Sequence, residues 1–267
     1  MVIFFNKYSP FKKIINLLAS ELIRENAKKY DSMAIISGDY ISTKIMLDGR
    51  FELVYLDALA KQIFPFIKNN ICIDAGANIG NHSVFFSRFF KKVYAFEPNK
   101  KPLEILKVNA KWNKNIEVVP YAVSDTQSIG YISQNQSNIG ASKLVAKNIE
   151  SNSLLLQIKL NLMDALIPKN QHANIGFIKL DVEGHEYEAM LGAEEIIVNS
   201  SPIIAFELLR KDYDVKFHKI RHFLNTHGYN KFMVYRFGKF RFSKKISKKN
   251  YKMILALPKK CYFNQKV

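Results

Sequence analysis

The sequence of 267 residues has little cysteine and no long apolar segment. Its two cysteines, Cys72 and Cys261, lie too far apart to form a disulfide framework or a metal-binding motif. No uncharged apolar run approaches the roughly 18 residues that a membrane-spanning helix requires. The apolar start at residues 1–5 is followed by lysines before a signal peptide could be complete. These absences predict a cytoplasmic protein without an inserted membrane segment.

Acidic residues are scarce relative to basic ones, because 23 Asp and Glu stand against 40 Lys and Arg, a net charge of +17. The imbalance is local, since residues 208–267 hold 17 Lys and Arg but only two Asp. Such a basic C-terminal part predicts an acidic partner, and both RNA phosphates and an anionic membrane surface fit. A solvated basic surface is the simpler alternative. Hydrophobic residues make up 48% of the chain, as in ordinary globular proteins, which excludes a disordered chain.

The first 69 residues predict an accessory layer. Apolar residues recur at helical spacing over Phe11–Lys28, with charged residues between them, so we expect an amphipathic helix. We expect it to pack against its own domain, with a position on a membrane surface as the alternative. An Asp-Gly pair that begins at Asp48 separates two alternating segments, Tyr40–Leu47 and Phe51–Leu56, and this pattern predicts a β-hairpin.

From Asn70 onward, short apolar runs alternate with stretches of helical length. Buried strands that alternate with helices are typical of an α/β fold with a mostly parallel sheet and helices on both faces. The expected strands are Ile71–Ile73, Val93–Phe96, Ile116–Val119, Ile175–Leu180, Ile203–Phe206, Phe232–Tyr235 and Lys252–Leu257. The expected helices are His82–Phe90, Pro102–Lys111, Glu186–Asn199 and Val215–Thr226. Cations alternate with aromatic residues over Tyr235–Phe242, which favours a hairpin over a base-stacking surface.

A glycine-containing loop follows the first of these strands, in the segment ICIDAGANIGNHS. The dinucleotide fingerprint GxGxxG fails here, because asparagine occupies two of the three glycine positions. What remains is DxGxxxG, whose carboxylate, Asp74, would repel a phosphate and attract an ammonium group. S-adenosylmethionine offers such an ammonium and has no phosphate. The cofactor contacts expected in this loop are Asp74, Gly76, Ala77, Asn78, Gly80 and Asn81.

Three further positions extend the predicted cofactor site. Glu97 ends the second strand in the segment AFEPN, where an acidic residue can accept hydrogen bonds from ribose hydroxyl groups. Pro98 follows it, and Ala122, just past the third strand, is expected near the adenine by analogy with the fold. A strand-end carboxylate is often only a helix cap, but two of them at the ends of the first two strands favour a binding site.

Charged residues crowd the end of the fourth core strand, in the segment IKLDVEGHE. Methyl transfer to a hydroxyl group needs a base near the acceptor and an aligned path to the methyl group. Asp181, Glu183 and His185 are the catalytic candidates, and the alternative is that these carboxylates only favour the start of the next helix. Two carboxylates and an imidazole could also ligate a divalent cation, but we predict no metal.

The segments IDAGANIGNHS, YAFEPN and IKLDVEGHE, in this order and spacing, resemble the FkbM family of S-adenosylmethionine-dependent methyltransferases. The resemblance covers about residues 70–208 and implies a Rossmann-like class I methyltransferase fold with a seven-stranded sheet. Members of the family mostly methylate hydroxyl groups, often of sugars. One departure is Leu162-Met163-Asp164, where the family usually carries Leu-Asp-Asp. The resemblance places Asp74, Gly76, Gly80 and Glu97 on the cofactor.

We therefore expect residues 1–69 to form an accessory helix and hairpin, and residues 70–267 to form an S-adenosylmethionine-dependent methyltransferase domain with the basic part at its end. The expected reaction is O-methylation of a hydroxyl group on a glycan or glycoconjugate acceptor. The polar segment 135–142 could close over that acceptor, so Asn138 and Ser142 are its expected contacts, and an ordinary solvated loop is the alternative.

Two other functions stay open. An RNA methyltransferase would use the same cofactor site and grip phosphates with the basic part, although nucleic acid is the weaker expectation. A degenerate fold could instead serve as a non-catalytic module that binds an anionic surface, with peripheral association with a membrane. The intact motif residues argue against this second alternative.

Overall fold

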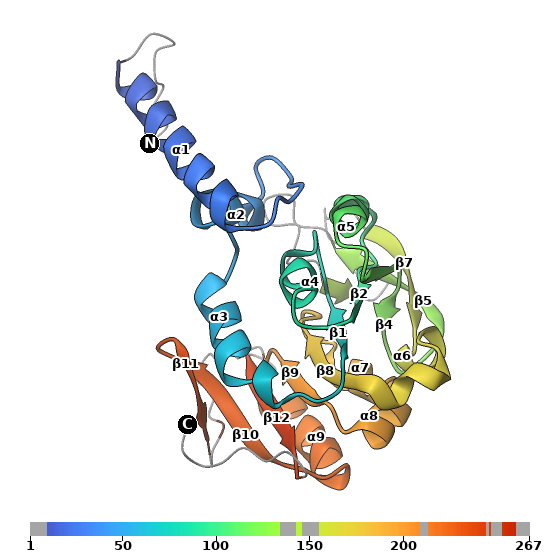
Figure 1. Cartoon of the computed structure of the whole chain (residues 1–267). Helices are drawn as coiled ribbons and strands as arrows, with labels where there is room; N and C mark the ends of the chain where they lie inside the picture. The colour runs from blue at the N-terminus through green and yellow to red at the C-terminus, as the bar shows by residue number, and fades with distance from the viewer. Residues whose placement is uncertain are drawn as a thin grey trace.

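The computed structural model describes residues 10–133, 143–145, 155–208, 213–243, 246 and 253–259, and Figure 1 shows their arrangement. The fold is α/β, with one eight-stranded sheet and a second sheet of four strands. The large sheet has the order β11-β10-β12-β9-β8-β1-β2-β3. Because β8 pairs with β1 while the intervening chain leaves the sheet, the strand order reverses next to β1, and ligand sites form at such points.

Five strands pair in parallel; β1, β2, β8 and β9 are mostly apolar and buried inside the sheet, and the partly exposed β3 forms its edge. Their positions confirm the predicted strands, with small extensions at two of them. The bounds are β1 (Ile71–Ala75), β2 (Lys92–Phe96), β3 (Ile116–Val119), β8 (Ile175–Leu180) and β9 (Ile203–Phe206).

The C-terminal part adds an antiparallel edge made of β10 (Tyr229–Arg236), β11 (Lys239–Phe242) and β12 (Ile254–Pro258). Strand β12 runs antiparallel to both β9 and β10, and β10 and β11 form a hairpin that turns at Phe237 and Gly238. The hairpin predicted around Tyr235–Phe242 is therefore confirmed. The seven expected strands of the class I methyltransferase sheet are present, and β11 extends the sheet by one strand.

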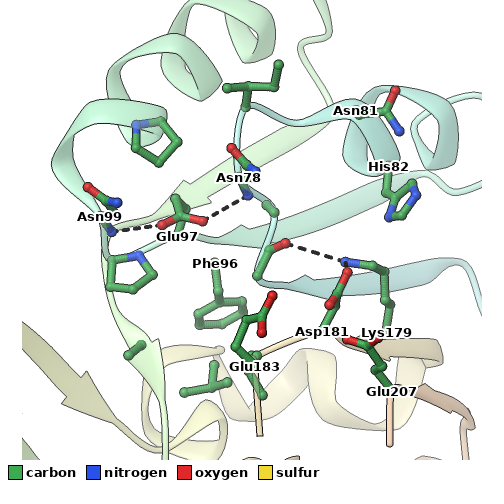
Figure 2. A pocket seen from close by; sticks show the side chains of 18 of the residues that line it. Asn78, Asn81, His82, Phe96, Glu97, Asn99, Lys179, Asp181, Glu183 and Glu207 are labelled. Atoms are coloured by element: carbon green, nitrogen blue, oxygen red, sulfur yellow. Dashed lines mark hydrogen bonds and ion pairs between the residues drawn. The ribbon is translucent and has the colours of Figure 1, made fainter. Parts of the chain in front are cut away.

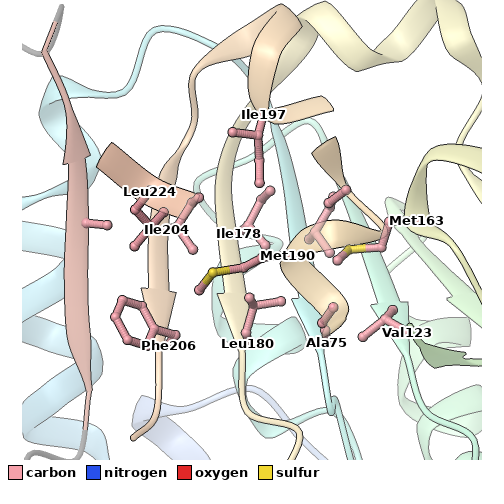
Figure 3. Packing of buried hydrophobic residues seen from close by; sticks show 14 of the residues in the cluster. Ala75, Val123, Met163, Ile178, Leu180, Met190, Ile197, Ile204, Phe206 and Leu224 are labelled. Atoms are coloured by element: carbon pink, nitrogen blue, oxygen red, sulfur yellow. The ribbon is translucent and has the colours of Figure 1, made fainter. Parts of the chain in front are cut away.

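Helices cover both faces of the sheet, and two hydrophobic clusters fill the spaces between them. Alternate residues of each strand point to opposite faces, so Ile73 joins one cluster and Cys72 the other. Figure 3 shows one cluster, where strand residues such as Leu180 and Phe206 lie near Met190. The helices are α4 (Asn81–Phe86), α5 (Lys100–Trp112), α6 (Met163–Leu166), α7 (Glu186–Leu191), α8 (Glu194–Ser200) and α9 (Tyr213–Thr226), with short 3-10 turns at Phe64–Phe66 and Lys169–Asn174.

The helix predicted over Glu186–Asn199 is divided into α7 and α8 at Gly192 and Ala193. Asp164 explains where α8 starts, because its two carboxylate oxygens accept hydrogen bonds from the backbone N–H groups of Glu195 and Ile196 at 2.9 and 3.0 Å. A carboxylate near the N-terminus of a helix satisfies donors that have no partner within the helix. Asp164, which follows the point of departure from the family pattern, is thus used to hold α8.

A second, smaller sheet lies between β3 and β8 in the sequence, and its strands were not predicted. Its order is β4-β7-β5-β6, and Ile132, Ile158 and Leu160 form a small hydrophobic cluster on it. The longest of these strands, β7, alternates apolar residues with polar ones, but β4 and β6 span only two and three residues and give little signal. Their bounds are β4 (Ala122–Val123), β5 (Ser128–Ser133), β6 (Lys143–Val145) and β7 (Leu155–Asn161).

The β-hairpin predicted near Asp48 is wrong, because this region forms helices α2 (Tyr40–Asp48) and α3 (Leu53–Gln62). The side chain of Asp39 accepts a hydrogen bond from the backbone N–H of Ser42 at 3.0 Å and so caps the start of α2. Gly49 adopts the left-handed conformation, with φ of 81°, and ends that helix. The Asp-Gly pair is therefore a helix end rather than a hairpin turn.

Helix α1 (Pro10–Lys29) confirms the predicted amphipathic helix, but the expectation that it packs on its own domain is wrong for the apolar side chains of its first half. Ile14, Leu17 and Leu18 are exposed by 56%, 67% and 64%. Figure 1 shows α1 projecting from the rest of the molecule, next to α2. Near the end of α1, the amide of Asn26 donates hydrogen bonds to the carbonyl oxygens of Met46 and Leu47. In the described part of the chain, no helix is long and apolar enough to cross a membrane.

Candidate functional site

A cavity of about 410 Å³ opens where β1, β2 and β8 end, which is the expected ligand position in an open parallel sheet. The predicted residues that line it are Gly76, Ala77, Asn78, Asn81, Glu97, Pro98, Ala122, Asp181, Glu183 and His185. Figure 2 shows its two sides, with Glu97 and Asn99 on one and His82, Lys179, Asp181 and Glu207 on the other. Asp74 and Gly80 lie behind the lining.

Asp74 is fully buried and points away from the open cavity. Its Oδ1 accepts a hydrogen bond from Nζ of Lys179 at 2.9 Å, and its Oδ2 accepts one from Oγ of Ser83 at 2.6 Å. Burial alone would raise the pKa of Asp74, but the charge of Lys179 outweighs it and holds that pKa below its ordinary value. A direct contact between Asp74 and a ligand remains a prediction, and the hydrogen bonds give Asp74 a clear role in placing Lys179.

Lys179 is the second-to-last residue of β8 and was missed in the sequence, because a lysine inside an apolar strand is usually assigned to an exposed edge. Its Nζ lies 2.9 Å from Asp74, 3.4 Å from Oδ2 of Asp181 and 3.4 Å from the carbonyl oxygen of Gly76. Burial opposes its charge, yet the two carboxylates raise the pKa of Lys179 above its ordinary value. Lys179 therefore stays charged and links the loop after β1 to the end of β8.

Glycine is required at position 76 of the loop after β1. Gly76 has φ of 78°, and a Cβ atom there would collide with the carbonyl oxygen of Asp181. The backbone N–H groups of Gly76 and Ala77 donate hydrogen bonds to the carbonyl oxygen of Phe96 at 3.0 and 2.9 Å. Gly80 forms the start of α4 and packs against Leu106. The loop is thus fixed to β2 and β8 in the shape that forms one wall of the cavity.

Glu97 is buried at the end of β2 and receives two backbone hydrogen bonds. The N–H groups of Asn78 and Asn99 donate to its two carboxylate oxygens at 2.9 and 2.8 Å. Burial raises the pKa of Glu97 to about 7, against the opposing effect of these hydrogen bonds. A carboxylate held in this way can accept hydrogen bonds from vicinal hydroxyl groups such as those of a ribose.

The wall next to Glu97 is mostly apolar. Pro98, Pro102, Tyr121, Ala122 and Val123 line it. The small sheet closes it with Ile132 and Ile158. A flat heterocycle can be buried between such side chains while polar groups at one edge fix its orientation.

The opposite end of the cavity holds a cluster of carboxyl groups at the ends of β8 and β9. Glu207 directly follows β9, lines the cavity, and was not identified from the sequence. Burial, together with the charges of Asp181, Glu183 and Glu186, raises the pKa of Glu207 to about 8. Burial likewise raises the pKa of Glu186 to about 7. At neutral pH, Asp181 and Glu207 together can hold a proton close to the cavity.

Glu183 and His185 occupy the turn between β8 and α7. Glu183 has φ of 54°, an unusual conformation for a residue other than glycine. Nε2 of His185 lies 3.0 Å from Oγ of Ser124, and its Nδ1 lies 3.5 Å from Glu188. Burial lowers the pKa of His185, although Glu188 opposes this shift. These contacts hold His185 beside the small sheet, where it lines the cavity.

The segment before α3 forms a further wall of the cavity, with Tyr40, Ile41, Phe51 and Glu52. Two asparagine side chains hold it there. The amide of Asn81 exchanges two hydrogen bonds with the backbone of Phe51, at 3.0 and 3.1 Å. The predicted contact of Asn81 with the cofactor stays a prediction, and its side chain is engaged with this segment.

Asn109 on α5 makes a similar pair of hydrogen bonds with the backbone of Ala34, which lies nearer the N-terminus than Phe51. Its Oδ1 accepts from the N–H of Ala34 at 2.7 Å, and its Nδ2 donates to the carbonyl oxygens of Ala34 and Ile79 at 3.1 and 2.7 Å. One buried side chain therefore joins the N-terminal segment to the loop after β1. Sequence reasoning missed Asn109 because a single polar residue in an amphipathic helix has no recognisable pattern.

The remaining predicted residues fall outside this description. Asn138 and Ser142 lie outside the described residues, so their contact with an acceptor remains a prediction. Among the residues that the structure describes, no group of three or more His, Cys, Asp or Glu is arranged to hold a metal ion.

The residues present fit the predicted cofactor, S-adenosylmethionine. Glu97 offers a carboxylate for the ribose, and the apolar wall beside it suits the adenine. The carboxylate of Asp181 suits the positive charge of the sulfonium group, which would lie next to the acceptor. The roles of the individual residues stay predictions.

Comparisons with known proteins bear on this arrangement. A family model described as the methyltransferase FkbM domain matches residues 74–231, which is more than half of the chain. A curated relative, the hexuronic acid methyltransferase AglP of Haloferax volcanii, is 30% identical over 125 residues, which cover 47% of this chain and 50% of the relative. The match therefore spans about half the length of that curated relative.

Solved structures are similar to the chain at low sequence identity. A methyltransferase FkbM from Methylobacillus flagellatus is 15% identical with a TM-score of 0.48, over 91% of this chain and 59% of that one. An rRNA methylase from Streptococcus thermophilus is 15% identical with a TM-score of 0.45, over 77% and 95%. The TYW2 protein of M. jannaschii, solved in complex with AdoMet, is 12% identical with a TM-score of 0.37, over 77% and 76%.

Proposed function

Because this chain belongs to the FkbM family of methyltransferases, we propose that it transfers a methyl group from S-adenosylmethionine to a hydroxyl group of a sugar in a glycan or glycoconjugate. S-adenosylmethionine is the methyl donor that the family membership supports. One observation carries the proposal, which is the presence in a single cavity of a ribose-type carboxylate, Glu97, and a separate carboxyl cluster around Asp181.

The cofactor would lie along the loop after β1. Glu97 would accept the ribose hydroxyl groups, and the backbone around Gly76 would pass close to the methionine part. When bound, S-adenosylmethionine supplies an electrophilic methyl group on a positively charged sulfur. Asp181 and Glu207 lie at the opposite end of the cavity from Glu97, so we assign that end to the acceptor.

Asp181 is the residue that we assign as the base. Lys179 lies 3.4 Å from its Oδ2 and is itself fixed by Asp74, so the Asp181 carboxylate has a defined orientation. Asp181 would take the proton of the acceptor hydroxyl as its oxygen attacks the methyl group, and the raised pKa of Glu207 would let the carboxyl pair keep that proton. The surrounding side chains, by excluding water, align the reacting groups for in-line displacement.

A sugar hydroxyl is the acceptor class supported by two lines of reasoning. The curated relative, matched over 47% of this chain, is described as a hexuronic acid methyltransferase. A hydroxyl group is a weak acid, so its methylation benefits from a positioned base, and the carboxyl cluster provides candidates for one. The basic C-terminal part also leaves RNA as an alternative acceptor, which the following experiment separates.

The test is incubation of the protein with methyl-labelled S-adenosylmethionine and three fractions: soluble glycans, lipid-linked glycans and RNA. We expect label in a glycan fraction and its loss with Asp181→Asn. As a matched control, Asp48→Asn changes an exposed aspartate of α2 and should leave the label unchanged. Label confined to RNA, with binding that weakens steeply in salt, would replace the proposal with an RNA methyltransferase.

A further inference from the structure

His82 and Glu52 form a polar pair in the cavity that the proposed reaction does not use. His82 lies on α4 and Glu52 just before α3, and both line the cavity. Nε2 of His82 is 3.5 Å from Oε2 of Glu52, and the two side chains are exposed by only 8% and 15%. His82 lies on the same side of the cavity as Asp181 and Glu207 (Figure 2), and Glu52 is next to it.

The imidazole of His82 has an unsatisfied nitrogen. Its Nε2 is buried and makes no hydrogen bond among the described residues, since 3.5 Å to Glu52 is too long for a well-formed one. The ring stacks on Phe86 at a centroid distance of 5.9 Å and lies 6.2 Å from Tyr55, so neighbouring rings fix its orientation. A buried polar atom without a partner is rare and calls for a ligand or water.

A hydroxyl group is the ligand chemistry that this pair can satisfy. A hydroxyl can donate a hydrogen bond to the Glu52 carboxylate and accept or donate one at Nε2 of His82. A carboxylate has no proton to donate at neutral pH, so it could not pair with Glu52. The pair therefore selects for hydroxyl groups over acidic groups.

The charges at this end of the cavity also disfavour an acidic group on the acceptor. Glu52, Asp181 and Glu207 line it, and the ammonium of Lys179 is already used by Asp74 and Asp181. An acceptor carboxylate brought close to Glu52 and Asp181 in this partly buried space would be repelled by their negative charges. Edge-to-face rings of Tyr40 and Phe51, 6.1 Å apart, line the same wall and offer an apolar surface for the face of a sugar ring.

We propose that Glu52 and His82 bind a hydroxyl group of the acceptor, and that the methylated sugar carries no carboxylate. This inference rests on the proposed glycan methylation and narrows it, because it excludes the acid class named for the curated relative. Asn81 and Asn109 act as positioning residues, since they hold the segment that carries Glu52 against the cavity.

The first experiment identifies the labelled sugar. Glycan that has received labelled methyl from S-adenosylmethionine is hydrolysed, and its sugars are separated by anion-exchange chromatography. We expect the label in an uncharged or amino sugar. Label in a methylated uronic acid would overturn this inference while leaving the proposed function intact, whereas no label in any glycan would overturn both.

The second experiment uses Glu52→Gln and His82→Gln, with binding of S-adenosylhomocysteine as the readout for an intact cofactor site. We expect at least a tenfold rise in the KM for the labelled acceptor, with S-adenosylhomocysteine affinity unchanged within about twofold. Glu104→Gln, an exposed glutamate of α5 paired with Lys107 at 2.8 Å, is the matched control. An unchanged KM in both test variants, or a loss confined to cofactor affinity, would overturn the subsite.

A second inference comes from a separate observation, the apolar face of α1. Ile14, Leu18 and Leu22 are spaced four residues apart, lie on one side of the helix, and are exposed by 56%, 64% and 44%. The helix projects from the molecule (Figure 1), so this face is available to an external partner. A row of exposed apolar side chains on a projecting helix marks an interaction surface.

Charge decides which partner suits this surface. Helix α1 contains five Lys and Arg and two Glu, in a chain of net charge +17. A second copy of the chain would bring the same positive charge, whereas an anionic bilayer attracts it. We propose that α1 lies on the surface of an anionic phospholipid bilayer, with Leu18 and Leu22 in the acyl boundary.

The probe is vesicles of phosphatidylglycerol and phosphatidylcholine, compared with phosphatidylcholine alone, in a co-sedimentation assay. We expect binding to the anionic vesicles and at least a tenfold weaker partitioning for Leu18→Asp. Ala27→Asp adds the same charge to an exposed position on another side of the helix and should weaken binding far less. Equal losses in the two variants, or a wild-type dimer that Leu18→Asp dissociates without any vesicle binding, would overturn this assignment.

Discussion

Lys179 and Asp74 form a buried ion pair that joins β8 to β1 beneath the cavity, with Nζ 2.9 Å from Oδ1. Their side chains are exposed by only 1% and 0%. Because Lys179 also reaches Asp181 at 3.4 Å, the carboxylate of the first motif fixes the residue that orients the proposed base. The two motifs that are farthest apart in the sequence are therefore connected by a single ammonium group.

Breaking this pair should destabilise the protein strongly. In Asp74→Asn the charge of Lys179 stays buried without its main partner, so the free energy of unfolding should fall by about 3–5 kcal/mol, as measured by urea denaturation. Asp48→Asn removes an exposed partner of Lys44 and should cost less than about 1 kcal/mol. Equal stabilities for these two variants would show that the buried pair has no special role.

Stability of the ligand-free protein should fall as the pH rises from 5 to 8.5. Burial raises the pKa values of Glu97 and Glu186 to about 7 and of Glu207 to about 8, from 4.5. At these three glutamates the folded state binds more protons than the unfolded state, so each rise in pH favours unfolding, and the lowered pKa of His185 opposes this trend only at the acidic end of the window. We expect a loss of about 2 kcal/mol or more in the free energy of unfolding.

Asp74 affects the free energy of unfolding in the opposite direction, but only below this pH window. Its pKa is lowered from 3.8, so its stabilising effect is present above that value and is lost only in stronger acid. Urea denaturation at pH 5, 6, 7 and 8.5 measures the trend. Stability that increases steadily across this range would contradict the burial of the three glutamates.

Asp181→Asn should reduce turnover far more than cofactor affinity. Loss of a positioned base typically lowers the rate by about 100-fold to 10,000-fold. Initial rates with labelled S-adenosylmethionine measure kcat, and calorimetry with S-adenosylhomocysteine measures affinity. A variant that keeps more than half of the wild-type kcat would move the base to another residue.

The pH dependence of turnover should carry the signature of Glu207. Since its pKa is raised to about 8, the rate should increase as the pH rises through about 8 and the carboxyl pair loses its proton. Glu207→Gln removes the titrating group, so this limb of the kcat profile should disappear. The same rising limb in the variant would assign it to a different group.

Asn81→Ala should loosen the segment before α3. The change removes the two hydrogen bonds that the Asn81 side chain makes with the backbone of Phe51, at 3.0 and 3.1 Å. We expect faster hydrogen exchange at Phe51 and its neighbours, together with a higher KM for the acceptor. Asn225→Ala, at an exposed position of α9, should change neither quantity. Unaltered exchange in Asn81→Ala would mean that other contacts suffice to hold this segment.

The central strands were predictable because each is a short apolar run, and a fully buried parallel strand leaves this pattern in the sequence. The helices α2 and α3 were not predictable in this way, since alternation around an Asp-Gly pair also fits a β-hairpin. The cap that Asp39 forms at the start of α2 is the feature that favours a helix over a hairpin. The small sheet was also missed, although β7 alternates regularly, because β4 and β6 span only two and three residues and leave little pattern in the sequence.

The residues of the candidate site were predictable where a carboxylate directly follows a predicted strand. Glu97 and Asp181 each end a strand, so the topology places them at the cavity. Lys179, Glu207 and the Glu52–His82 pair depend on contacts between distant segments, which spacing along the chain does not encode. The Asp74 side chain shows the same limit, because its burial behind Lys179 follows from packing alone.

The most direct test of the account is calorimetric titration of S-adenosylhomocysteine into the wild type, Glu97→Gln and the matched control Glu104→Gln. We expect one binding site for S-adenosylhomocysteine in the wild type. Its affinity should fall by about tenfold or more in Glu97→Gln, because a charged hydrogen-bond acceptor is lost, and should not change in Glu104→Gln. Binding that is absent in the wild type, or equal in all three proteins, would contradict the assignment of this cavity to the methyl donor.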